Sequence, residues 1–141
     1  MDEKEKIEKK QDIYKAELEK LFVENDGELT PEKVVNSAKK ASSPLHDYYD
    51  WEDTVAGKLW RLHQTRVLFG YVKVDLPIIR NEPNRTVRIA LQVINADNKS
   101  VYVPTLTCIK TKSYAKQLVD EIITELDTLN NKMMLFKQNL K

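Results

Sequence analysis

The end of the chain carries a helical pattern that is too long for the rest of the sequence to cover. Between residues 112 and 137, apolar residues recur every three or four positions, which is close to a heptad stripe. The stripe consists of Ala115, Leu118, Ile122, Leu126, Leu129, Met133 and Phe136. A helix of about 26 residues is about 39 Å long, whereas a three-stranded sheet is about 20 Å across. The pattern therefore predicts a helix whose second half packs on the N-terminal helix, on a second copy of the chain or on a partner.

A second apolar stripe predicts a helix over residues 3–23 and, together with the first stripe, an oligomer. Its apolar positions are Ile7, Tyr14, Leu18 and Leu21, set among lysines and glutamates. Within one chain the two stripes can cover only each other, and the C-terminal stripe is long enough to continue past that contact. We therefore expect a homodimer built on the last helix through Leu126, Leu129, Met133 and Phe136.

Start and stop signals place two more helices before the strands. Thr30 is a good N-cap in front of a proline, so a second helix is expected to begin there and to end near Ala41. Asp50, followed by Asp53, has the spacing of a capping box and predicts a third helix over residues 51–68. The face of this helix that is expected to pack consists of Val55, Leu59, Leu62, Arg66 and Phe69, with Trp60 beside it.

From Tyr71 onward the apolar period changes to two, which is typical of strands. The segments YVKVDLPII and TVRIALQVI predict a hairpin that turns at residues 81–84. With Arg80 opposite Arg85, every inward position pairs two apolar residues: Val72 with Val93, Val74 with Leu91, Leu76 with Ile89, and Ile78 with Val87. A third strand, SVYVP, is expected to add its two valines to the same face, which gives a three-stranded antiparallel meander.

These elements together predict an α+β fold. Residues 1–28 are expected to form a charged N-terminal helix, and residues 29–141 a single domain. Within that domain we expect a helical elbow over residues 29–69, the sheet over residues 70–108, and the terminal helix over residues 112–137.

The stretch SSPLHDYYDW, residues 42–51, is interpreted as the structural elbow between the second and third helices. Pro44 stops the preceding helix. Tyr49 and Trp51 are large enough to plug the gap between the two helices. His46 is expected to donate a ring N–H to a carbonyl at the end of the preceding helix, because the last carbonyls of a helix lack partners within it.

Two reactive interpretations of the same stretch lack further support in the sequence. His46 could act as a general base with Asp47 or Asp50 to orient it, but no nucleophile and no glycine-built oxyanion hole accompany it. A metal site made of His46, Asp47, Asp50 and His63 would suit zinc or manganese, but the spacing follows no known motif. We therefore assign no catalytic residue, no metal ligand and no cofactor, and do not expect an enzyme.

Residues 29–68 resemble a segment of small proteins from tailed phages and prophages. The matching residues are Leu29-Thr30-Pro31-Glu32, Val34-Val35, Ser43-Pro44-Leu45-His46, Tyr49, Trp51, Asp53, Arg61, Gln64 and Arg66. The chain departs from that pattern at Tyr49, where the pattern has Phe, and at Thr65, where it has Ala. The resemblance implies an origin in a phage or mobile element, and it implies no activity.

The net charge of +1 conceals an uneven distribution of charge along the chain. Residues 1–57 contain 9 basic and 15 acidic residues, whereas residues 58–116 contain 11 basic and 3 acidic ones. An open sheet face with basic and aromatic side chains can contact phosphates and stack bases. The predicted nucleic-acid surface consists of Lys73, Arg80, Arg85, Arg88, Tyr102, Lys110 and Lys112. The alternative is that the acidic N-terminal part folds against the basic middle and neutralises it.

These features favour a non-enzymatic accessory protein of phage origin that binds DNA or RNA through its basic sheet and hairpin. The alternative is a protein-interaction module, either a host-factor inhibitor or an assembly component, that acts through its long terminal helices. Cys108 is the only cysteine, which suits the reducing cytoplasm of a host cell. The sequence has no run of about 18 apolar residues, so we expect no membrane partner.

Overall fold

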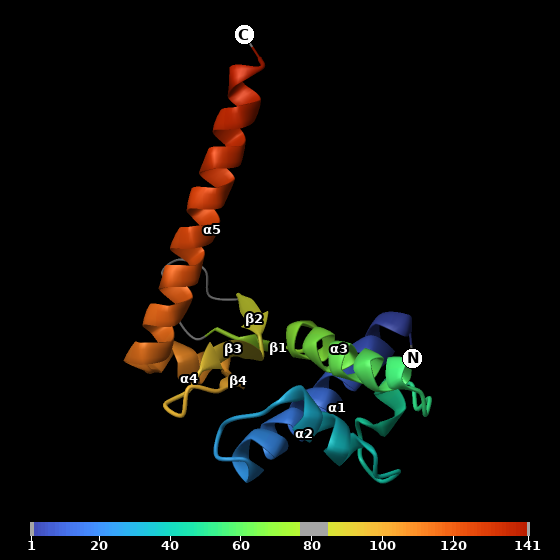
Figure 1. The fold of residues 1–141 in the computed structure, drawn as a ribbon. Coiled ribbons are helices and arrows are strands. Elements are labelled where there is room, and N and C mark those ends of the chain that lie inside the picture. Colours follow the sequence, from blue (N-terminus) through green and yellow to red (C-terminus); the bar gives the residue numbers. More distant parts are fainter. Residues whose placement is uncertain (1, 77–84, 141) are drawn as a thin grey trace.

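The computed structural model describes residues 2–76 and 85–140, which form helices and short strands (Figure 1). The elements are α1 (Glu3–Glu24), α2 (Pro31–Ala38), the 3-10 helix η1 (His46–Tyr48), α3 (Val55–Tyr71), β1 (Lys73–Asp75), β2 (Thr86–Arg88), β3 (Ala90–Ile94), β4 (Ser100–Pro104), α4 (Thr105–Lys110) and α5 (Lys112–Gln138). Helices α1, α2 and α3 lie together on one side of the strands, and α4 and α5 lie on the other (Figure 1). The expected α+β class is confirmed.

The helical side of the molecule holds the larger of two apolar clusters. Its fully buried members include Leu18 of α1, Leu29 just before α2, Val34 of α2, Leu45 of the elbow and Phe69 of α3. Thr30 caps α2 as predicted, because its hydroxyl accepts from the Lys33 N–H and Pro31 follows at the first helical position. The apolar stripe of α1 packs along most of its length: Leu18 and Leu21 are buried and Tyr14 packs against the core, whereas Ile7 is exposed.

The predicted start of α3 is wrong, and its predicted packing face is only partly right, because Leu62 and Phe69 pack on the core whereas the other members do not. The helix begins at Val55, and its cap is Thr54, whose hydroxyl accepts from the Gly57 N–H at 2.9 Å. Val55 and Leu59 are exposed, and the buried residues are Gly57, Arg61, Thr65, Leu68 and Phe69. Two of these residues are polar and gain hydrogen bonds inside the fold. A search for apolar periodicity passes over such a face because polar residues interrupt it.

The strands form two separate two-stranded sheets, so the predicted three-stranded meander is wrong. The first sheet pairs β1 with β2 and places Val74 opposite Val87, four residues away from its predicted partner Leu91. Because the displacement is even, each side chain keeps the face that the sequence predicted. The predicted turn at residues 81–84 and the predicted positions of Ile78 and Arg80 lie outside the described residues.

The predicted second strand divides at Ile89, and this division explains the two sheets. The N–H of Ile89 donates to the carbonyl of Val72, and its own carbonyl accepts from the N–H of Thr105, both at 2.9 Å. Residues before Ile89 therefore join β1, and residues after it form β3 and join β4. The β3–β4 register places Val93 opposite Val101 and Gln92 opposite Tyr102.

Strand β4 is buried on both faces, which the alternating pattern did not predict. Val101 and Val103 face a second apolar cluster that includes Cys108 of α4. Tyr102 was expected to point away from the core, but only 6% of it is exposed, and its ring stacks on Phe69 with centroids 4.4 Å apart. Its backbone also exchanges two hydrogen bonds with Leu29. The hairpin is thus enclosed between the helical side and α4.

Helix α5 agrees with the predicted bounds and projects away from the rest of the molecule (Figure 1). Tyr114 and Leu118 near its start pack on the second apolar cluster, and all residues described after Leu118 are exposed. The expectation that the two terminal stripes cover each other is wrong, because Figure 1 places the N-terminus and the free end of α5 far apart. None of the helices within residues 2–76 and 85–140, α5 included, has the length and apolar content that a membrane crossing requires.

Candidate functional site

The elbow between α2 and α3 is organised by a stack of three side chains. The His46 ring lies nearly parallel to the Trp51 indole, with the ring centroids 5.0 Å apart. The Arg61 guanidinium lies over the Trp51 ring, 5.1 Å from its centroid. The Trp51 indole N–H donates to the carbonyl of His46 at 2.8 Å. As predicted, the His46 ring bonds to a carbonyl at the end of α2, that of Ala38, with its Nδ1 2.8 Å from the oxygen.

Arg61 holds the segment that leads into α3. The sequence placed it outside the packed face, but only 3% of the residue is exposed. Its guanidinium donates to the carbonyls of Asp50 and Glu52 at 3.0 and 2.9 Å. Charge-assisted bonds of this kind are stronger than bonds between neutral groups. Arg61 therefore supplies the hydrogen bonds that these two carbonyls would otherwise form in a helix or a sheet. The only feature of the sequence that indicates its burial is its four-residue spacing from Gly57 and Thr65.

Two tyrosines anchor the elbow to α3 through their hydroxyl groups. Tyr48 donates to the carbonyl of Gln64 at 2.8 Å. Tyr49 donates to the hydroxyl of Thr65 at 2.6 Å, since that hydroxyl in turn donates to the carbonyl of Arg61. Burial raises the pKa of Tyr48 from 10.0 to about 12 and raises the pKa of Tyr49 further still, because the ionised phenolate would lose its hydration.

Three of the four groups that suggested chemistry at the elbow, Asp50, His63 and His46, are engaged in structural contacts. The Asp50 carboxylate accepts from the Trp60 indole at 3.0 Å, and the His63 ring packs against the same indole. The His46 Nδ1 is bonded to Ala38. Among residues 2–76 and 85–140, no three His, Cys, Asp or Glu side chains gather closely enough to hold a metal ion. These contacts support the structural interpretation of Pro44, His46, Tyr49 and Trp51.

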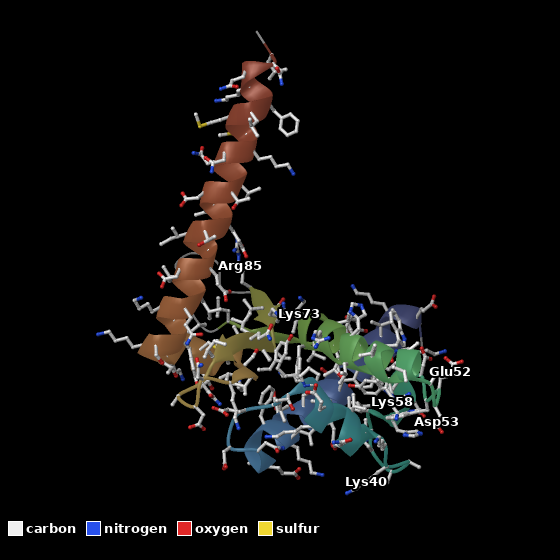
Figure 2. The ribbon with its side chains drawn as sticks, in the orientation of Figure 1. Lys40, Glu52, Asp53, Lys58, Lys73 and Arg85 are labelled. Carbon is white, nitrogen blue, oxygen red and sulfur yellow. The ribbon has the colours of Figure 1, made fainter. Side chains whose placement is uncertain are left out.

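The predicted basic residues do not gather on one open sheet face. Lys73 and Arg88 are cross-strand partners in the first sheet, but Arg88 is half-buried and its Nε donates to the carbonyl of Ala90 at 2.9 Å. Arg85 is exposed just before β2. Figure 2 places Lys73 and Arg85 between the helical side and α5. Lys110 and Lys112 lie where α4 meets α5, and Arg80 lies outside the described residues.

Burial of Tyr102 removes the predicted aromatic platform for a base. The ring is stacked on Phe69 and only 6% of the residue is exposed, so it offers no open face on which a base could stack. Lys73 belongs to the first sheet and Tyr102 to the second, so these two residues of the predicted surface do not share a sheet.

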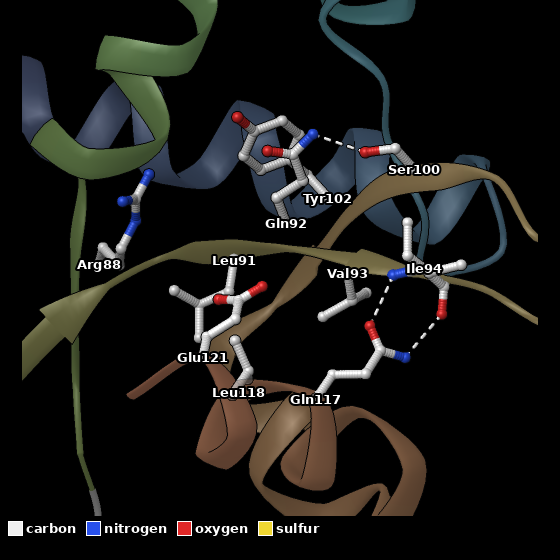
Figure 3. Close-up of a pocket in the computed structure, with 10 residues that line it drawn as sticks. All are labelled: Arg88, Leu91, Gln92, Val93, Ile94, Ser100, Tyr102, Gln117, Leu118 and Glu121. Carbon is white, nitrogen blue, oxygen red and sulfur yellow. Dashed lines mark hydrogen bonds between the residues drawn. The ribbon is translucent and has the colours of Figure 1, made fainter. Parts of the chain in front are cut away.

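A groove of about 390 Å³ runs between β3 and the start of α5 (Figure 3). The Gln117 amide spans it: its Oε1 accepts from the Ile94 N–H at 2.8 Å, and its Nε2 donates to the Ile94 carbonyl at 2.9 Å. The side chain thereby satisfies both backbone groups that Ile94 presents away from β4. Gln117 closes this part of the strand edge and ties α5 to β3.

The apolar residues of α5 form the most extensive exposed apolar surface of the described chain. Between 50% and 64% of each of six side chains is exposed along the helix: Val119, Ile122, Leu126, Leu129, Met133 and Phe136. We call these six residues the α5 heptad face. Exposed contiguous apolar surface of this kind marks interaction sites in soluble proteins.

No family model matches this sequence, and no curated protein or solved structure is significantly similar to it. The α5 heptad face, the elbow and the dispersed basic residues are therefore the features from which a function can be inferred.

Proposed function

We propose that this chain is a non-enzymatic protein-interaction module that uses α5 as its contact surface. One observation carries the proposal: the α5 heptad face continues for more than two heptads beyond Leu118, the last residue of α5 that packs on the rest of the molecule. In proteins most of the stability of a helix comes from the tertiary packing of its apolar face. A helix half that lacks tertiary contacts and carries large apolar residues is therefore stabilised when a partner covers it.

The contacts at the base of α5 support this role by holding the helix in a defined direction. Gln117 forms two hydrogen bonds with Ile94, and Leu118 packs on the second apolar cluster. An element that is fixed at one end and free at the other presents its apolar face with little loss of conformational entropy on binding. The resemblance of residues 29–68 extends the proposal to an accessory protein of a phage or prophage.

A site-specific photo-crosslinker tests the contact surface directly. Benzoylphenylalanine is introduced at Leu129, on the heptad face, or at Asn131, on the opposite side of the same helix, and bacterial cells that express each full-length variant are irradiated. We expect a crosslinked adduct of discrete mass from position 129 and little from position 131. Absence of an adduct at 129, or equal yields at the two positions, would contradict the proposal.

Nucleic-acid binding is a second candidate function, supported by the neighbouring cations of the first sheet. Lys73 of β1 and Arg88 of β2 are directly opposite each other, and Arg85 lies just before β2. Residues 58–116, which include these three cations, contain 11 basic and 3 acidic residues. Phosphate contacts from such side chains make affinity fall steeply with salt.

Fluorescence anisotropy with labelled single- and double-stranded DNA tests this candidate at low salt. The double change Lys73→Ala, Arg85→Ala should weaken binding and reduce the salt slope by about 2, since each lost phosphate contact reduces it by about 1. The matched control is Lys40→Ala, Lys58→Ala, which removes the same charge from the helical side (Figure 2). Equal loss in both double variants, or no binding by the wild type, excludes a site at Lys73 and Arg85.

A further inference from the structure

The α5 heptad face follows a strict alternation of three- and four-residue steps. Val119, Leu126 and Met133 occupy one core position of the heptad, and Ile122, Leu129 and Phe136 occupy the other. Such a seam is the pattern by which one helix packs along another. The face extends over about two and a half heptads, from Val119 to Phe136, and a second helix can pack along it.

The heptad face is distinct from the face that fixes α5 to the rest of the molecule. Tyr114, Gln117 and Leu118 make the contacts with the strands. Val119 and Ile122, which begin the heptad face beside them, remain exposed at 53% each. Because a helix advances about 100° per residue, the two sets lie about a quarter turn apart. A partner helix can therefore cover the heptad face without displacing β3.

The charges that flank the heptad face disfavour a parallel pair of α5 helices. In a parallel pair, the residue before each of Val119, Leu126 and Met133 faces the residue five positions later on the other helix. Lys132 would then face Lys137 of the second copy, twice in the dimer. Glu125 would face Asn130 and gain no opposite charge. Like charges in this position oppose association.

Among antiparallel registers, one alone places opposite charges beside the seam. A pair centred near Thr124 sets Glu125 against Glu125 of the second copy, and a pair centred near Asn131 sets Lys132 against Lys132 of the second copy. A pair centred between Asp127 and Thr128 sets Glu125 against Lys132 of the second copy, twice. The same register aligns all six residues of the heptad face with their counterparts.

The remaining charged pair of this register lies at its ends. Lys116 would approach Lys137 of the second copy there. Lys116 already forms an ion pair with Asp120, at 3.2 Å, which offsets its charge. The central ion pairs are therefore the ones that select the register.

We infer that α5 binds α5 of a second copy of this chain in antiparallel orientation, with Leu126 packed against Leu129 of the second copy at the centre and Glu125 paired with Lys132 of the second copy. The inference rests on the proposed function, because it names the partner of the same surface. The second α5 helix covers the apolar residues that are exposed along the free half of α5. This pairing also leaves the two molecular bodies at opposite ends of the paired helices.

Charge reversal in the full-length protein tests both the partner and the orientation. Glu125→Lys and Lys132→Glu should each raise the dimer dissociation constant about tenfold at low salt, because two attractive pairs become repulsive at about 0.2–1 kcal/mol for each pair. An equimolar mixture of the two variants should restore wild-type affinity, because every pair in the mixed dimer again joins opposite charges. Sedimentation equilibrium measures all four samples.

Asp127→Lys is the matched control, because it makes the same change of charge on the outer side of α5. It should leave the dissociation constant within about twofold of wild type, since exposed charges away from the seam contribute little. Tighter dimerisation of Lys132→Glu would overturn the inference in favour of a parallel pair, and failure of the mixture to recover would overturn the register. A monomeric wild type whose position 129 crosslinks to another protein would overturn self-association and leave the proposed function standing; a monomer without any adduct would overturn both.

Discussion

Trp51 connects His46, Arg61 and Tyr49, so its removal should unsettle the whole elbow. We expect Trp51→Ala to reduce the free energy of unfolding by about 3 kcal/mol, because truncation of a large aromatic residue leaves a cavity and here also uncovers Arg61. Trp60→Ala is the control: its indole is 49% exposed and bonds to Asp50 at the surface, so the loss should stay below about 1 kcal/mol. Urea denaturation measures both, and equal losses would show that the stack is not a stabilising unit.

Tyr48 should make the protein sensitive to alkali over a defined pH range. Below pH 10.0 both folded and unfolded chains keep the phenol protonated, whereas between 10.0 and about 12 only the unfolded chain releases the proton. The free energy of unfolding should therefore fall as the pH rises through this range. In Tyr48→Phe the fall should be shallower, although at neutral pH the variant should lose about 1 kcal/mol with its bond to Gln64. Parallel pH profiles for the two proteins would contradict the shift.

The contact of a single residue was predictable where a backbone group without a hydrogen-bond partner lay near one suitable side chain in the sequence. The bond from His46 to the end of α2 follows from the carbonyls that every helix end leaves open. The burial of Arg61 and Tyr102 was not predictable in this way, since long amphipathic side chains can lie either at the surface or inside the fold. The choice between them depends on contacts with Asp50, Glu52 and Phe69 that only the folded chain brings together.

At the scale of elements, the cap of α3 gives a direct test of where that helix begins. Thr54→Ala should reduce the free energy of unfolding by about 1 kcal/mol, because the Gly57 N–H loses its acceptor. Asp53→Ala, one residue earlier and exposed, should change it by less than about 0.5 kcal/mol. Thermal or urea unfolding of the two variants distinguishes them. A larger loss for Asp53→Ala would move the start of the helix back to the position that the capping-box pattern favoured.

The strands show which part of a sheet the pattern of residues determines. Alternation correctly assigned Val74, Val87, Val93 and Val101 to packed positions, because each side chain needs only the right face. It did not determine the partner, since displacements by an even number of residues leave every face unchanged. The bend at Ile89, which sends β2 and β3 to different partners, arises from its bonds to Val72 and Thr105 and leaves no mark in the alternation.

At the scale of the whole molecule, the direction of α5 sets the dimensions of the protein. A compact chain of 141 residues has a radius of gyration of about 14 Å. With α5 extended as in Figure 1, small-angle X-ray scattering should give a clearly larger value at every concentration, and a further rise as α5 helices pair. A radius near 14 Å would mean that α5 folds back onto the helical side. The sequence predicted the length of α5, but its direction depends on the Gln117 contacts with β3.

The contact between Gln117 and Ile94 also limits how copies of this chain can misassemble. An open strand edge recruits strands from other molecules and starts aggregation. The amide of Gln117 imitates a neighbouring strand at Ile94 and occupies both groups that an incoming backbone would use there. The side chain that anchors the helix thus also protects the hairpin, because a strand from another molecule finds no free backbone group at Ile94.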